Sequence, residues 1–391
     1  MLLYDVREGK EYIPEKGNIN VISSSIYRKY RKENWHSKYL HSQTLNQVII
    51  NLVGNYKSYK ALEEMYEKDP KSLKGKPRVP RYKGEDGQEI VFGKEGIRVE
   101  KSKIRLSISK EMQNKHKVKS LDISLPRKVR NQIEMERIKI IRVRYKNQKI
   151  EMYIIYERDE KEKTENTNIM AIDLGLNNLA ACTNKENSKA MLVSGKEIKS
   201  KNKYINEKIK HYQSIMMKML KESKKYKNTK RIKKLYEYRR RYMETVMHKA
   251  SREVIKYAKE NKCKVIVIGD IKDIKQNMRR NSSFVQIPLQ SLVEKIEYKA
   301  KLEGIEVKKI SEAYTSGVSS LDKEEISKEN YNPKRRIHRG LFVSNDGKKI
   351  NADINGSLNI LRKYIKNSSP KEEIQMDNGR EQLPIKKRVA C

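Results

Sequence analysis

Two short, continuous apolar runs constrain the fold of this chain more than any other feature of its sequence. The first, IMAID, ends at Asp173, and the second, KVIVIG, spans residues 264–269. Apolar runs of this kind, without polar alternation, are typical of buried strands. They predict that the second half of the chain is built around a buried sheet.

The segments around these runs predict a definite order of elements. IMAIDLGLNNLAACTN and AMLVSG read as early strands, and a long basic helical hairpin fills about 200–260, with a break near Lys227 and Asn228. A helix over 288–303, a strand over 304–312 and a closing helix over 351–365 follow. This order of three strands, a helix, a strand, a helix, a strand and a helix is that of the RNase H-like fold.

The first half of the chain has a different organisation. Apolar spacing is helical from Ile26 to Met65, and the helical region ends at Asp69-Pro70. Residues 89–158 then show short alternating runs, and Asn147-Gln148 reads as a hairpin turn between two of them. We expect a small antiparallel β-domain here, in the form of a barrel.

The predicted fold class is therefore α+β and multidomain. The expected layout is a helical region over 1–86, the β-barrel over 87–166, the RNase H-like domain over 167–365 and a disordered tail over 366–391.

The charge of the chain indicates a polyanionic partner. Its 391 residues include 89 Lys or Arg against 50 Asp or Glu, a formal net charge of +39. The basic residues run the whole length and are interleaved with 23 Tyr, which suits a nucleic acid with unpaired bases better than a membrane surface. AT-rich codon usage would raise Lys and Glu together, so it does not account for the surplus.

Several classes of protein are excluded by the sequence. It contains no apolar stretch of about 18 residues that could cross a membrane, and its start lacks the apolar run of a signal peptide. Its three cysteines, Cys182, Cys263 and Cys391, are too far apart for a disulfide framework or a Cys-rich zinc site. We expect a reducing, cytoplasmic setting with association to the nucleoid.

Acidic residues stand where an RNase H-like nuclease needs them. Asp173 ends the first buried run, and Asp353 begins the closing helix. The second run ends at Gly269 rather than at an acid, and Asp270 would point to the opposite face of the strand. Glu312 ends the neighbouring predicted strand, so we rank it above Asp270. Such acids hold two divalent ions about 4 Å apart, and hard oxygen ligands favour Mg²⁺, with Mn²⁺ as the substitute.

From Gln43 to Ile365 the chain resembles the TnpB (OrfB-type) proteins of insertion sequences. The motifs that carry the resemblance stand in family order: IDLGLNNLAACTN, YMETVMHKASREVIKYA, VIVIGDIKDIKQN, NSSFVQIPLQSLVEKIEYKAKLEGIEV, EAYTSGVSSLD and RRIHRGLFVSNDGKKINADINGSLNILRK. The family comprises RNA-guided DNA nucleases with a RuvC-like catalytic domain, related to type V CRISPR effectors.

The resemblance implies partners and catalytic residues. A helical insert and a wedge-like barrel would read a short DNA motif beside a double-stranded target, and the RuvC-like domain would bind a guide RNA from the element end and cut. A separate transposase could be encoded by the same element. The acids would be Asp173 and Asp353. Many family members have the middle Glu where Gly269 stands, but one branch carries it just before a YTS motif, as Glu312 does here.

Two departures from the family pattern are visible. Family members often carry paired CxxC motifs before the last acid, whereas residues 315–353 contain no Cys, so no zinc is expected and the basic loop must be ordered by nucleic acid or not at all. Val318 stands where even the rearranged branch often keeps a Cys. The chain also opens partway into the family pattern, so the barrel is expected to lack its first strand, and this would expose an edge.

Further residues are candidate nucleic-acid contacts. Three arginines within five positions on one loop seldom serve packing, while solvation or surface polarity explains the other candidates equally well or better. These candidates are Ser42, Gln43, Gln47, His248, Lys249, Arg335, Arg336 and Arg339.

Competing functions stay open at this point. A nuclease-inactive or decayed RNA-guided DNA-binding protein would use the same basic surfaces without chemistry, and a structural RNA-binding protein would need no acids. A transposase with a Tyr nucleophile needs a His pair near it, and the six His are scattered. An acid-based transposase shares the RNase H-like fold, so fold alone does not exclude it.

Overall fold

The computed structural model describes residues 13, 18–33, 35–81, 89–100, 102–131, 133–146, 149–186, 189–220, 228–270, 287–338, 340–368 and 384–389. The chain divides into two compact units, Met1–Arg158 and Asp159–Cys391. The predicted helical region and β-domain thus share one unit, here called the N-terminal unit. The expectation that the barrel lacks its first strand concerns residues 1–12, which lie outside the described ranges.

The helical part of the N-terminal unit consists of two helices with a short 3₁₀ turn between them. These are α2 (Ile19–Glu33), η1 (Trp35–Tyr39) and α3 (Ser42–Lys68). Ile22 and Ile26 of α2 pack against Ile49 and Val53 of α3. The helical region ends before Pro70, as predicted, but the single period expected from 26 to 65 is interrupted by the 3₁₀ turn.

The β part of the N-terminal unit has two three-stranded antiparallel sheets. One has the order β1-β5-β6, from β1 (Glu89–Gly93), β5 (Ile138–Lys146) and β6 (Lys149–Tyr156). The other is β2-β3-β4, from β2 (Ile97–Val99), β3 (Lys103–Ser107) and β4 (Ser120–Ser124).

Both sheets contribute to one core, in which Phe92 and Ile141 of the first sheet meet Ile104 and Leu106 of the second. The short helices α4 (Lys110–His116) and α5 (Arg127–Arg130) connect the strands, with the 3₁₀ turns η2 (Lys94–Gly96) and η3 (Met135–Arg137). The antiparallel β-domain is confirmed. Its closure into a wedge-like barrel stays a prediction, and the expected turn at 147–148 lies outside the described residues.

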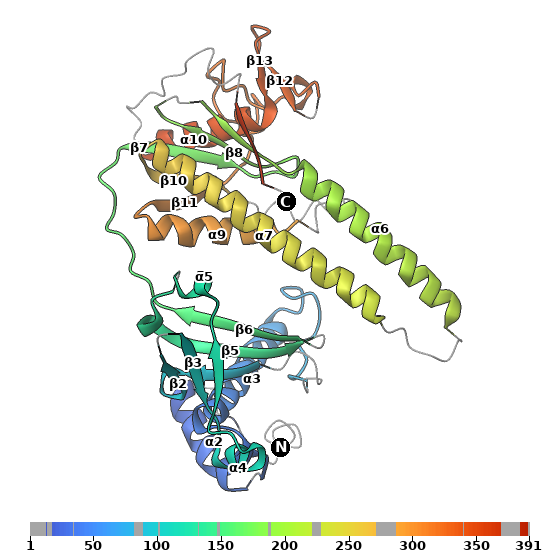
Figure 1. Ribbon diagram of the computed structural model, residues 1–391. Coiled ribbons are helices and arrows are strands. Elements are labelled where there is room, and N and C mark those ends of the chain that lie inside the picture. The colour runs from blue at the N-terminus through green and yellow to red at the C-terminus, as the bar shows by residue number, and fades with distance from the viewer. Residues whose placement is uncertain are drawn as a thin grey trace. The chain divides into compact units, whose positions relative to one another are not determined.

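The C-terminal unit is organised around a six-stranded mixed sheet of order β11-β10-β7-β8-β9-β14 (Figure 1). Its strands are β7 (Asn168–Asp173), β8 (Asn178–Asn184), β9 (Met191–Ser194), β10 (Cys263–Gly269), β11 (Glu306–Ile310) and β14 (Ile385–Arg388). Strand β8 is antiparallel to both of its neighbours, β7 and β9, whereas β10 and β11 run parallel to β7.

The helices of this unit are α6 (Lys196–Met219), α7 (Lys230–Glu260), α9 (Leu289–Leu302) and α10 (Ala352–Ser368). The order of strands and helices is the one predicted for an RNase H-like domain.

The C-terminal strand corrects one expectation. Residues 366–391 were predicted to be a disordered tail, yet α10 continues to Ser368, and β14 pairs in parallel with β9 at the edge of the sheet. The segment IKKR has no apolar alternation, so nothing in its sequence distinguishes it from a solvated tail.

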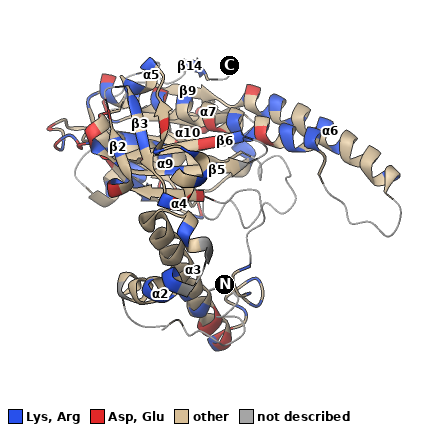
Figure 2. Cartoon of the chain, turned by 60° about the horizontal axis from the view of Figure 1, so that its bottom comes forward, with Lys and Arg blue, Asp and Glu red and all other residues tan. Residues whose placement is uncertain are grey.

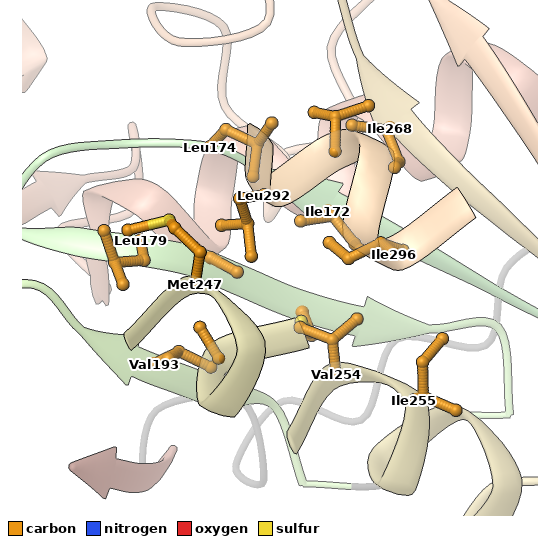
Figure 3. Packing of buried hydrophobic residues seen from close by; sticks show 14 of the residues in the cluster. Ile172, Leu174, Leu179, Val193, Met247, Val254, Ile255, Ile268, Leu292 and Ile296 are labelled. Carbon is orange, nitrogen blue, oxygen red and sulfur yellow. The ribbon is translucent and has the colours of Figure 1, made fainter. Parts of the chain in front are cut away.

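Helices cover both faces of this sheet. On one face, Ile172 of β7 and Ile268 of β10 pack against Val254 of α7 and Ile296 of α9 (Figure 3). On the other face, Ala171 and Val267 meet Ile360, Leu361 and Ile365 of α10. The apolar runs IMAID and KVIVIG are therefore buried on both sides, which explains their lack of polar alternation.

Positive charge is distributed over both units. Lys and Arg occur on nearly every helix and strand, with visible bands along the first half of α6 (Figure 2). No helix within the described ranges is long and apolar enough to cross a membrane.

Candidate active site

The predicted acids lie at one edge of the mixed sheet of the C-terminal unit. Asp173 is the last residue of β7, and the register pairs Ile172 of this strand with Ile268 of β10. Gly269 follows Ile268 and pairs with Ile310 at the end of β11, two residues before Glu312. Because these three strands are parallel, their carboxyl ends meet at the same edge. The predicted strand over 304–312 is adjacent to β10, but it ends at Ile310 rather than at Glu312.

Asp353 reaches this edge from the start of α10. Asn351 caps the helix, its Oδ1 accepting from the backbone N of Asp353 at 3.0 Å and of Ile354 at 3.3 Å. The Asp353 carboxylate accepts from Asn178 Nδ2 at 2.8 Å and from Arg336 Nη2 at 2.9 Å. One oxygen is thus held by a residue of β8 and the other by the loop that precedes α10.

Two glycines leave the space that these carboxylates occupy. A Cβ on Gly356 of α10 would lie 2.5 Å from Oδ2 of Asp173. A Cβ on Gly269 would overlap the Glu312 side chain and lie 2.5 Å from its Cδ. The missing side chains therefore allow α10 to approach Asp173 closely and allow Glu312 to fold back over the end of β10.

The electrostatics of Asp173 show that the other two acids act on it. Burial, together with the negative charges of Glu312 and Asp353, raises the pKa of Asp173 well above its ordinary value, while Arg336 acts in the opposite direction. The charges acting on Asp173 thus include Glu312, the residue ranked above Asp270 from the sequence. A buried acid whose ionisation is disfavoured by neighbouring carboxylates is typical of a functional site.

The donor chemistry of this cluster fits a hard divalent cation. Asp173, Glu312 and Asp353 offer only carboxylate oxygens, which suit Mg²⁺ or Mn²⁺. In the part of the chain that the structure describes, no three acidic, imidazole or thiol groups already converge as a preformed metal-ligand set. A physical reason is visible at Asp353, where the Arg336 guanidinium supplies the positive charge that one carboxylate needs.

The loop between Glu312 and α10 is held by the protein's own side chains. It contains η4 (Pro333–Arg335) and the hairpin β12 (Leu341–Val343) and β13 (Lys349–Asn351). Both Glu324 carboxylate oxygens accept from Arg335 Nη1 at 2.7 Å, and Oε1 also accepts from Asn345 Nδ2 at 2.8 Å. The interpretation that this loop must be ordered by nucleic acid or not at all is therefore wrong for the residues described.

Two asparagines of α10 attach the start of the same loop. Asn355 Nδ2 donates to the carbonyl of Val318 at 2.8 Å, and Asn359 Nδ2 donates to the same oxygen at 2.7 Å and to Thr315 at 2.9 Å. Val318 itself is fully buried. The position where some family members keep a Cys is thus occupied by an apolar residue with its backbone tied to α10.

The three predicted loop arginines have different surroundings. Arg335 forms an ion pair with Glu324, the two side chains being 20% and 15% exposed, which gives it a structural role. Arg336 contacts Asp353 directly. Arg339 lies outside the described residues. Nucleic-acid contact by these arginines stays a prediction.

The other predicted contact residues lie away from the acids. His248 and Lys249 are half-buried on α7, and His248 Nε2 lies 3.2 Å from Glu244 Oε1. Burial, followed by the charges of Lys295 and Lys299, lowers the pKa of His248. In the N-terminal unit, Gln43 donates to Glu95, while Ser42 is exposed. Ser42, Gln43 and Gln47 all lie in the first two turns of α3, and their role stays a prediction.

Several residues of the site were not predicted from the sequence. The structure adds three residues through their contacts. Asn178 donates to Asp353, Gly356 lies against Asp173, and Glu324 pairs with Arg335. Asn178 lies in the run DLGLNN directly after Asp173, and a polar residue beginning the next antiparallel strand was the available signal. For Glu324 the sequence offered none, because its partners are 11 and 21 positions away in an irregular loop.

The order of strands and helices in this unit is that of an RNase H-like domain, and three carboxylates come from the edge of its sheet and from the start of α10. Two family models match the chain. Residues 142–275 match the OrfB_IS605 family model, described as a probable transposase, and residues 290–360 match the Cas12f1-like TNB domain. These matches confirm the resemblance to TnpB (OrfB-type) proteins that the motifs of the chain indicated.

Individual relatives are more distant. The CRISPR-associated endodeoxyribonuclease Cas12f2 of Micrarchaeota archaeon (strain CG1_02_47_40) is 26% identical over 250 residues, which are 59% of this chain and 43% of the relative. The match therefore spans less than half of the length of that protein.

Two solved structures share the fold. A cryo-EM structure of a Cas12f1–sgRNA–target DNA complex matches with a TM-score of 0.60 at 18% identity, covering 92% of this chain and 78% of that one. CasPhi-2 (Cas12j) bound to crRNA matches with a TM-score of 0.50 at 9% identity, covering 95% and 93%. At these identities the likeness concerns the fold alone.

Proposed function

We propose that this protein is an RNA-guided DNA endonuclease of a mobile element, cutting DNA at the edge formed by Asp173, Glu312 and Asp353. The observation that carries the proposal is the electrostatic effect of Glu312 and Asp353 on the buried Asp173, three carboxylates that come from separate parts of the chain. Maintaining such repulsion costs stability, and a catalytic use explains it.

The residues of the site have distinct roles in this proposal. Asp173, Glu312 and Asp353 would hold two divalent ions, Mg²⁺ or Mn²⁺, which when bound activate the attacking water and stabilise the leaving oxygen. Asn178 keeps the Asp353 carboxylate turned towards the edge through its 2.8 Å hydrogen bond. Gly269 and Gly356 keep the space over Glu312 and Asp173 free of side chains.

The proposed partners are a guide RNA and a double-stranded DNA target with a short adjacent motif. Relatives with the same fold were solved with sgRNA and target DNA, or with crRNA, and the net charge of +39 suits a complex with long polyanions. Most of that charge would neutralise the guide and its heteroduplex with DNA. The helical and β regions of the N-terminal unit would read the motif.

The test is reconstitution of the full chain with the RNA that copurifies with it. With Mg²⁺, the complex should cut a duplex matched to the guide, and Asp173→Ala, Glu312→Ala and Asp353→Ala should each abolish cutting while target binding persists. Asp270→Ala serves as the matched control and should still cut. A complex that binds its target but cuts with neither Mg²⁺ nor Mn²⁺ would contradict nuclease activity and favour an RNA-guided binding protein.

A further inference from the structure

The hairpin of α6 and α7 presents a row of alternating aromatic and basic side chains that the proposed catalytic edge does not use. We call it the tyrosine–lysine face. Its members are Lys201, Tyr204, Lys208, Tyr212, Arg231 and Tyr238.

The rings and cations of this face contact one another in sequence. Lys201 Nζ lies 5.9 Å from the ring centroid of Tyr204 and 5.5 Å from that of Tyr238, so it bridges the two helices. Lys208 Nζ lies 5.6 Å from Tyr204 on its other side. Farther along, Arg231 Cζ lies 4.4 Å above Tyr212. Each ring thus has a cation beside it, in the range of cation–π attraction.

The outer tyrosines of this face do not hold the hairpin together. Ile205, Ile209 and Ile232 form its buried core, whereas Tyr204 and Tyr238 are 54% and 47% exposed. Tyr238 is nevertheless held in place, because it stacks on Tyr242 at 6.4 Å and 22°, and Tyr242 packs against the main core. Two large exposed rings held in place by cations and a buried neighbour suit the stacking of unpaired bases.

The face starts at the catalytic edge. Strand β9 runs in the same direction as β7, because β8 lies between them and is antiparallel to both. It ends at Ser194, and α6 begins two residues later. The first turn of α6 is tied to the β7–β8 turn, since Gly195 N donates to the carbonyl of Asn177 and Lys199 Nζ donates to Asn177 Oδ1 at 3.0 Å. The next residue, Asn178, donates to Asp353. At about 1.5 Å per residue, Tyr204 is only about 12 Å along the helix from its start.

We infer that the tyrosine–lysine face is a binding site for single-stranded DNA, and that it carries the strand being cut to or from the acids. This rests on the proposed nuclease function for the identity of the strand. The bases stack on Tyr204 and Tyr238, while Lys201, between the two rings, and Lys208, beyond Tyr204, contact phosphates of the same strand. A duplex would not expose its bases to these rings, and a strand lying on the face is continuous with the edge that holds Asp353.

Binding is tested with the full chain carrying Asp173→Ala, so that no DNA is cut, and a fluorescent thymidine oligonucleotide. Tyr204→Ala and Tyr238→Ala should each weaken binding by about fivefold or more, the lower end of the range for loss of one stacked base. Tyr298→Ala, which removes a similarly exposed tyrosine from α9, should leave the affinity unchanged.

Charge is tested on the same helix. Lys201→Gln and Lys208→Gln should each reduce the salt dependence of binding by a slope of about 0.7. Lys203→Gln removes the same charge from the opposite side of α6, where Lys203 is 81% exposed, and should not change the slope. Equal effects of all three substitutions would overturn the proposal in favour of unspecific attraction.

An RNA arm and a cutting arm complete the experiment. If the tyrosine substitutions weaken binding of an RNA of equal length but not of DNA, the face is an RNA site and the inference is overturned. In proteins with intact Asp173, Tyr204→Ala combined with Tyr238→Ala should slow cutting at least tenfold without loss of target binding. An unchanged cutting rate would contradict the idea that the face carries the strand to or from the acids. If the parent protein never cuts, the nuclease proposal fails, while the DNA-binding arm still decides whether the face binds single strands.

Discussion

Glu312 occupies the space that a side chain at Gly269 would need. Gly269 ends β10, and Glu312 follows the end of the adjacent parallel strand β11 by two residues. A Cβ placed on Gly269 would overlap Oε1 and Cγ of Glu312 and lie 2.5 Å from its Cδ. The end of β10 therefore lacks a side chain because the acid that follows β11 occupies that space. A carboxylate stands at this edge, but it is supplied by the neighbouring strand.

Gly269→Ala should displace the Glu312 carboxylate without unfolding the sheet, because Gly269 has ordinary extended backbone geometry and pairs with Ile310. We expect cutting to fall by about a hundredfold, as for a misplacement of about 1 Å at a catalytic group, with DNA binding unchanged. Gly54→Ala, where a Cβ meets nothing within 4 Å, is the control. Cleavage rates and circular dichroism are the measurements.

The exchange Gly269→Glu with Glu312→Gly gives the converse test. It returns the acid to the end of β10 and removes the side chain that would collide with it. We expect the double variant to cut faster than either single variant, because each single change leaves either two competing carboxylates or none. A double variant as inactive as Glu312→Gly would show that this edge needs its carboxylate on β11.

Arg336→Gln should make the metal-free protein less stable. Its guanidinium is 2.9 Å from Asp353 Oδ1 and opposes the effect of Glu312 and Asp353 on Asp173. After discounting for the partial exposure of the arginine, we expect a loss of about 1 kcal/mol, or about 2–4 °C in the melting temperature of a unit of this size.

The response of this variant to Mg²⁺ decides between two roles of Arg336. If the guanidinium neutralises the acids, added Mg²⁺ should raise the melting temperature of Arg336→Gln more than that of the parent, because the ion replaces the missing charge. Lys348→Gln removes a positive charge from an exposed position of the same loop and should behave like the parent. An equal Mg²⁺ response in all three proteins would assign Arg336 to packing only.

The sheet and two of its acids were predictable because the signals are local. A run such as KVIVIG specifies a buried strand, and Asp173 ends such a strand directly. Glu312 could be ranked above Asp270 because Gly269 left a vacancy in the expected pattern. Asp173 and Glu312 come to one edge because β7, β10 and β11 are parallel, and Asp353 reaches this edge from the start of α10.

The remaining features depend on contacts between residues whose sequence carries no pattern. Glu324 and Arg335 lie 11 positions apart in an irregular loop, so neither helical nor strand spacing indicates their pairing. The three arginines close together predict a nucleic-acid contact, and this spacing gave no sign of the ion pair between Arg335 and Glu324. Strand β14 is four polar residues at a sheet edge, stabilised by backbone pairing with β9 rather than by side chains that periodicity could detect.

Glu324→Gln should loosen the loop between Glu312 and α10. The change weakens the acceptor for Arg335, Asn345 and the backbone N of Ser319, and leaves a mostly buried guanidinium without its counter-charge. We expect a loss of about 2 kcal/mol, seen as a lower melting temperature and faster protease cleavage within 313–351. Glu325→Gln is a matched control one residue away, because its ion pair with Lys366 is 66% and 71% exposed. Equal effects of the two changes would refute a special role of Glu324.

Lys299 should give the protein a distinctive stability in alkaline solution. Its Nζ donates to the carbonyl of His248 at 2.8 Å and to Ser251 Oγ at 2.6 Å. Burial, with the charges of Arg252 and Lys295, lowers the pKa of Lys299 to about 8. In the unfolded chain the same group titrates near its ordinary value, about 10.4.

Between these two values the unfolded state binds more protons than the folded state, so the contribution of Lys299 to stability rises with pH from about 8 to about 10.4. Below pH 8 the lysine is charged in both states, and its burial opposes folding. Lys299→Met removes the titration while keeping the length of the side chain. Urea unfolding of both proteins at pH 7 and pH 9.5 should therefore show the parent gaining stability relative to Lys299→Met as the pH rises. If the free energies of unfolding of the parent and Lys299→Met differ by the same amount at pH 7 and pH 9.5, the lowered pKa of Lys299 is contradicted.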